Sequence, residues 1–152
     1  MIISHEFVHN YHDLKRDNVC KRTMKLLRNN ERYKNINSEA EFLEFKSDFI
    51  SVYVRLLILE EIFATSIHIK IAGYLLDIGA FNAGNMYNSN PIVDEFKHLI
   101  MARDYGPNSQ TNGTREFYRK KLYEFVTDPA RGYVRWATDE ANEITDKVQS
   151  QP

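Results

Sequence analysis

SEAEFLEFKSDFISVYVRLLILEEIFATSIHIKIAGYLLD, residues 38–77, carries the strongest structural signal in this chain. Ser38 followed by Glu41 is a capping-box pattern, in which two side chains satisfy free backbone N–H groups of a first helical turn. Apolar residues then recur at helical spacing to about Asp77, beginning with Phe42, Phe45 and Phe49. The stretch therefore predicts helix, and Gly79 is a suitable residue for its C-terminal end.

The length of this helical pattern predicts an interruption. One helix from Glu39 to Asp77 would be roughly 58 Å long at about 1.5 Å per residue. That length exceeds the diameter expected of one compact domain of 152 residues. We therefore predict a break near Ser47–Ser51.

The remaining chain predicts shorter helices between turns. Turn-forming Gly and Asn residues cluster at 79–90. Helices are expected at 91–103, 114–126 and 138–147, with a break at Asp128-Pro129 and with Tyr133 and Trp136 packed inward. Strand signal is weak throughout, so the predicted fold class is mainly α, in one domain spanning residues 1–152.

Composition narrows the class of protein. The chain is 43% hydrophobic and 27% charged, with a net charge of −1. No global field attracts nucleic acid or an anionic membrane. The single cysteine excludes an intrachain disulfide framework, and no secretory signal is visible, so we expect a cytoplasmic protein. Charges interrupt the apolar residues 50–76, which argues against a membrane span.

A possible metal motif occurs at the start of the chain, in Ser4-His5-Glu6-Phe7-Val8-His9-Asn10. On a helix, His-Glu-x-x-His places two imidazoles one turn apart on one face, a spacing that suits two ligands of one zinc ion. Glu6 lies on the neighbouring flank, where it could accept a proton from water. His12 is either a further ligand or an exposed residue, and Asp13 is positioned to orient His9.

A zinc held by two histidines needs a third protein ligand. Glu60 and Glu61 form the acidic pair inside the apolar run, where a carboxylate needs a compensating partner. Glu60 has the more apolar neighbours along the helix, so it is the preferred ligand and Glu61 the second choice. The alternative is that one of them pairs with Arg55 or Lys70 or faces solvent.

Residues 15–34 are rich in lysine and arginine. Such a run usually forms a solvated face, and a nucleic-acid patch is the less favoured interpretation.

Three segments give the chain a resemblance to a bacterial family of zincin-like metallopeptidases of otherwise unknown function. The first is SHEFVHNY at residues 4–11, similar to the family's metal helix. The second is LEEIFAT at 59–65, running on to AGYL at 72–75, similar to a helix that opens with Glu in an acidic patch. The third is YEFVTDPAR at 123–131, which resembles a helix end near the family's C-terminus.

The resemblance implies a zinc-dependent peptidase with a zincin-like helical core. It implies His5, His9 and Glu60 as ligands of Zn²⁺, Glu6 as catalytic base, and a peptide or protein as substrate. Two features depart from the family. His5 follows Met1 too closely for the usual N-terminal sheet layer, which suggests a truncated domain, and Ile62 replaces a further acid.

Two other functions remain as alternatives. The first is a catalytically inactive helical interaction or regulatory protein that retains a vestigial metal motif. The second is a nucleic-acid-associated module that uses residues 15–34.

Overall fold

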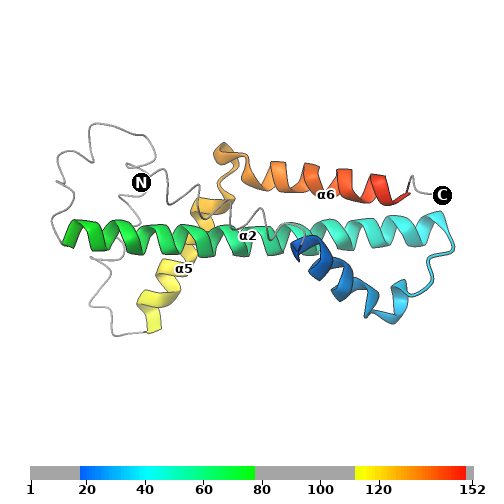
Figure 1. Cartoon of the computed structure of the whole chain (residues 1–152), viewed down its shortest axis with the longest axis horizontal. Coiled ribbons are helices and arrows are strands. Elements are labelled where there is room, and N and C mark those ends of the chain that lie inside the picture. The colour runs from blue at the N-terminus through cyan, green and yellow to red at the C-terminus, as the bar shows by residue number, and fades with distance from the viewer. Residues whose placement is uncertain (1–17, 78–111, 150–152) are drawn as a thin grey trace. The chain divides into compact units, whose positions relative to one another are not determined.

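The structure is a computed structural model that describes residues 18–77 and 112–149 (Figure 1). Its regular elements in these ranges are all helical, which confirms the predicted mainly α class. After a helix at 18–28 come the 3₁₀ helix η1 (Glu31–Tyr33), α2 (Glu39–Asp77), α5 (Asn112–Thr127), the 3₁₀ helix η2 (Pro129–Arg131) and α6 (Tyr133–Gln149). The predicted turns at 79–90 and helix at 91–103 lie outside the described residues.

The chain divides into two compact units. One comprises Met1–Glu61 and Thr127–Pro152, and the other comprises Ile62–Val126. No helix in the described residues combines the length and hydropathy needed to cross a bilayer.

The helix α2 is continuous, so the predicted break near Ser47–Ser51 is wrong. The prediction assumed that the whole helix belongs to one compact domain, whereas the boundary between the two units falls within α2, after Glu61. Neither Pro nor Gly occurs at residues 47–51, and the buried positions Phe49 and Tyr53 keep the helical spacing across this segment. Nothing in the local sequence therefore interrupts the backbone hydrogen bonds.

The capping box at the start of α2 is confirmed. The backbone N–H of Glu41 donates to Ser38 Oγ at 3.2 Å, and the backbone N–H of Ser38 donates to Glu41 Oε2 at 3.0 Å. The Asn37 N–H donates to the same carboxylate oxygen at 2.8 Å. These bonds occupy backbone donors that the helix itself leaves unpaired.

Aromatic side chains at helical spacing form the core of the first unit. The rings of Phe49 and Tyr53 stack with centroids 5.6 Å apart and an angle of 14° between their planes. Phe45 lies 6.1 Å from Phe49 and meets Tyr33 edge-on at 5.6 Å. All four side chains are buried. Burial of these large apolar surfaces is the main favourable contribution to folding in this unit.

The helix α6 belongs to the same unit, and its alanines complete the core. Ala137 and Ala141 are fully buried in one cluster with the α2 aromatics. Because an alanine side chain is small, it lets two helices approach closely. Lys46 Nζ also lies 2.5 Å from Asp146 Oδ1, an ion pair between α2 and α6.

The start of α6 corrects two predictions. Gly132 adopts φ +70°, which closes η2 and lets α6 begin at Tyr133 instead of residue 138. Trp136 is 37% exposed, so its predicted inward packing is wrong, whereas Tyr133 is half-buried as expected. Ala137, the next residue, takes the fully buried position.

In the second unit, α5 places Leu122 and Val126 in buried positions. The helix is slightly longer than the predicted 114–126. It ends as predicted at Asp128-Pro129, where Asp128 Oδ1 accepts a hydrogen bond from the Ala130 N–H at 2.9 Å. Ala64 and Ile69 are buried on the α2 segment of this unit.

Candidate functional site

The predicted site residues divide into two groups. His5, Glu6, His9, His12 and Asp13 lie outside the described residues. Glu60 and Glu61 lie on α2, and both side chains are half-buried.

Glu60 lines an open hollow of about 310 Å³ whose other lining residues come from the helix at 18–28. They are Asn18, Lys21, Arg22 and Lys25. Glu61 does not line this hollow. The structure thus distinguishes two carboxylates that are adjacent in sequence, because consecutive helical residues point about 100° apart.

The rim of the hollow at Glu60 is positively charged. Three exposed cationic side chains and one carboxylate line this hollow. The three cations are Lys21, Arg22 and Lys25. The sequence of α2 suggested Arg55 or Lys70 as partners of the acidic pair. The cations that share the hollow with Glu60 come from a segment more than thirty positions away, which helical spacing along α2 does not reveal.

The described residues do not by themselves form a metal site. Within residues 18–77 and 112–149, no three His, Cys, Asp or Glu side chains are grouped closely enough to hold a metal ion. Glu60 and the side-chain oxygen of Asn18 are donors of the kind that divalent cations accept, whereas a charged Lys or Arg is not. The imidazoles predicted for a zinc site with Glu60, those of His5 and His9, lie outside the described residues.

The helix at 18–28 has a cationic face, which lies within the lysine- and arginine-rich residues 15–34. It carries Lys21, Arg22, Lys25 and Arg28 and no acidic residue. None of these four cations forms an ion pair with another residue in the described part of the chain. The signal that marks this face is the absence of acids from residues 18–28, since surface lysines are usually interspersed with them.

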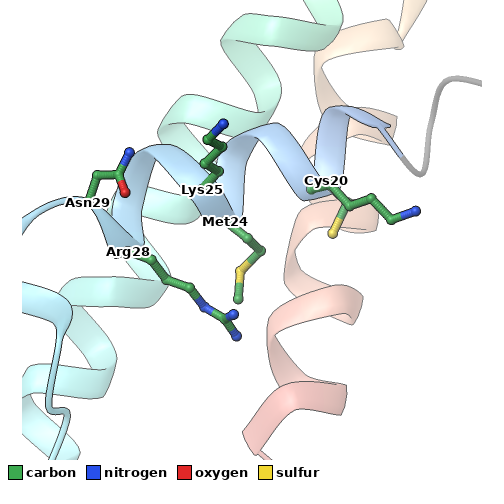
Figure 2. Close-up of a pocket in the computed structure, with 6 residues that line it drawn as sticks. Cys20, Met24, Lys25, Arg28 and Asn29 are labelled. Carbon is green, nitrogen blue, oxygen red and sulfur yellow. The ribbon is translucent and has the colours of Figure 1, made fainter.

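A second open hollow, of about 460 Å³, lies over this face (Figure 2). Cys20, Met24, Lys25, Arg28 and Asn29 line it together with Lys21. Figure 2 shows the Met24 thioether and the Arg28 guanidinium extending to the same side of the helix. An apolar surface and a cationic surface thus adjoin there.

Comparison of the chain with protein-family models, with curated proteins and with solved structures finds no match. The case for a function therefore rests on the residues themselves.

Proposed function

We propose that this chain is a zinc-dependent peptidase in which His5, His9 and Glu60 hold Zn²⁺ and Glu6 acts as general base. The observation that supports it is the hollow shared by Asn18 and Glu60. Asn18 is the ninth residue after His9. Nine residues span about 14 Å as helix and at most about 30 Å extended. The motif is therefore connected to the neighbourhood of Glu60 by a short segment.

The chemistry of the proposal assigns one task to each group. A zinc ion held there would supply Lewis acidity and lower the pKa of a coordinated water. Glu6 would accept the proton of that water and deliver it to the amine leaving group of the cleaved peptide. Glu60 and the two imidazoles would fix the position of the ion.

The deciding experiment is the metal content of purified protein, measured by elemental mass spectrometry. We expect about one zinc per chain in the wild type, because three ligands suffice for a catalytic zinc site. His9→Ala and Glu60→Ala should lose the metal. Glu61→Ala is the matched control, because it removes the neighbouring carboxylate, and it should retain zinc. Wild-type protein that stays free of zinc after reconstitution would contradict the proposal.

Peptidase activity is tested separately with Glu6→Gln, which keeps the size of the side chain and removes the base. Loss of general-base catalysis typically lowers the rate by about 10²- to 10⁴-fold. We expect that loss with a fluorescently labelled casein substrate, at unchanged zinc content. An active Glu6→Gln variant would refute the role of Glu6 as general base. It would not contradict the proposed metal ligands.

One observation favours the second candidate, a helical interaction protein without catalysis. The positive rim of Glu60's hollow raises the local potential, and this works against the binding of a divalent cation. That candidate predicts a metal-free, fully folded protein whose Tm does not rise when zinc is added. A zinc-dependent rise in Tm would exclude it, since a ligand bound only by the native state stabilises that state.

A further inference from the structure

The helix at 18–28 has distinct faces around its circumference. Its buried face consists of Val19, Thr23 and Leu27. With about 100° between consecutive residues, Cys20 and Met24 lie next to that face. The cations follow further around the helix, in the order Arg28, Lys21, Lys25 and Arg22. A half-buried apolar edge therefore adjoins an exposed cationic ridge.

The apolar edge continues into a further hollow, of about 430 Å³. Met24 and Arg28 line both this hollow and the cationic one in Figure 2. The additional lining is mainly apolar and aromatic, and includes Tyr33, Ile36, Phe42 and Phe45. Two neighbouring hollows thus share two side chains, and the one in Figure 2 adds the cations Lys21 and Lys25, so a single extended ligand could occupy both.

We propose that this surface binds an acidic peptide segment, with apolar side chains of the peptide in the hollow at Phe42 and its carboxylates along Lys21, Lys25 and Arg28. Within the described residues these three cations form no ion pair, and Lys21 and Lys25 also line the hollow that contains Glu60. Apolar burial supplies affinity and the charges supply orientation, as in most peptide interfaces. The proposal is independent of zinc.

Two observations favour a peptide over nucleic acid. Proteins that bind single strands stack bases on aromatic side chains beside the cations, and no aromatic residue lines the cationic hollow. The aromatic rings occur in the other hollow, where Phe45 and Tyr33 are buried and Phe42 is half-buried. In addition, the chain as a whole has a net charge of −1, whereas nucleic-acid domains are usually strongly basic.

The test measures fluorescence anisotropy of a labelled peptide of about ten residues, half leucine and phenylalanine and half glutamate, with metal-free full-length protein. Two altered peptides separate the contribution of the charges from that of the apolar side chains. One has glutamine in place of glutamate, and the other has serine in place of the apolar residues. Both should bind at least about tenfold more weakly than the complete peptide. Raising the salt concentration from about 50 to about 300 mM should weaken binding of the complete peptide, because it shortens the Debye length to below about 6 Å.

The protein variants locate the site. Lys21→Glu/Lys25→Glu should weaken peptide binding by at least about tenfold. Arg119→Glu/Arg135→Glu is the matched control, since it reverses two exposed charges outside this helix, and it should bind as the wild type does. Circular dichroism verifies that both variants fold.

Three results would overturn the proposal. The first is that the serine-substituted peptide binds as tightly as the complete one, which would show that the apolar hollow is not used. The second is equal binding by both double variants. The third is tighter binding of an oligothymidylate of the same length, which would assign the surface to nucleic acid. None of these outcomes bears on zinc content, so the peptidase proposal is judged separately.

Discussion

The hydroxyl of Tyr133 donates a hydrogen bond to the backbone carbonyl oxygen of Leu57 at 3.2 Å, joining the first turn of α6 to α2. The two residues are 76 positions apart in the chain. A helical carbonyl oxygen has two lone pairs, so Leu57 can accept this bond while keeping its bond within the helix.

Removing this hydroxyl should weaken the packing of α6 on α2. We expect Tyr133→Phe to lower the free energy of unfolding by about 1 kcal/mol, the typical net contribution of one hydrogen bond. The ring, whose centroid lies 5.4 Å from that of Trp136, is retained in this variant. Urea unfolding followed by circular dichroism measures the change. A variant as stable as wild type would show that the ring alone joins the helices.

The capping box predicts a specific loss of helix stability. Ser38→Ala removes the acceptor of the Glu41 N–H and should cost about 1 kcal/mol. The control is Ser47→Ala, the same substitution at an exposed position inside α2. There alanine has the higher helix propensity, so the control should be neutral or slightly stabilising by up to about 0.5 kcal/mol. Equal effects at the two positions would contradict the capping role.

The capping box of α2 also predicts that the stability of the protein depends on pH. Hydrogen bonds from the Asn37 backbone and then from Ser38 lower the pKa of Glu41 below its ordinary 4.5. Near that pH the unfolded chain therefore binds more protons than the folded one. The stabilisation by the Glu41 carboxylate is therefore fully present above the ordinary pKa of the group. It is lost as the pH falls through the lowered pKa of the folded state.

Glu41→Gln should accordingly be less stable than wild type at pH of about 6, and the difference should shrink towards pH of about 3. Urea unfolding of both proteins at several pH values in this range measures the difference in their free energies of unfolding. Glu39→Gln, in the same helical turn, is the control and should show the smaller change. A stability difference for Glu41→Gln that does not vary with pH would refute the role of the carboxylate.

The stacked aromatic pair predicts the largest effect of a single substitution in the first unit. Phe49 is fully buried, and Phe49→Ala should cost about 3–5 kcal/mol because it leaves a cavity in the core. Phe63→Ala makes the same change at a side chain that is 62% exposed. It should alter the free energy of unfolding by no more than about 0.5 kcal/mol. Similar losses in both variants would contradict the assigned core.

Continuity of α2 is tested with proline. Ser47→Pro should destabilise the protein by about 3 kcal/mol or more, since proline removes a backbone hydrogen bond and clashes with the preceding turn. Because Ser47 is exposed, the loss would not come from core packing. A well-tolerated proline, with unchanged helical content by circular dichroism, would indicate that the helix is interrupted there after all.

Local sequence patterns predicted those features that depend on neighbouring residues. The capping box at Ser38, the helical spacing of Phe42, Phe45 and Phe49, and the break at Asp128-Pro129 each involve groups within one or two turns. Their hydrogen bonds and rotational positions follow from the order of residues alone. The same reasoning failed for the break near Ser47–Ser51, because it used domain size instead of a local signal.

The neighbours of Glu60 show what the sequence alone could not decide. Helical spacing along α2 placed Glu60 in an apolar run and offered Arg55 or Lys70, on the same helix, as possible partners. The cations that share its hollow come from the helix at 18–28, and their approach depends on how the two helices pack. Likewise, Trp136 is exposed while Ala137 is buried, because close packing of α6 on α2 favours the smaller side chain. Local sequence predicted the capping box and most of the helical segments that are described. Packing between distant segments decided which charges and side chains meet.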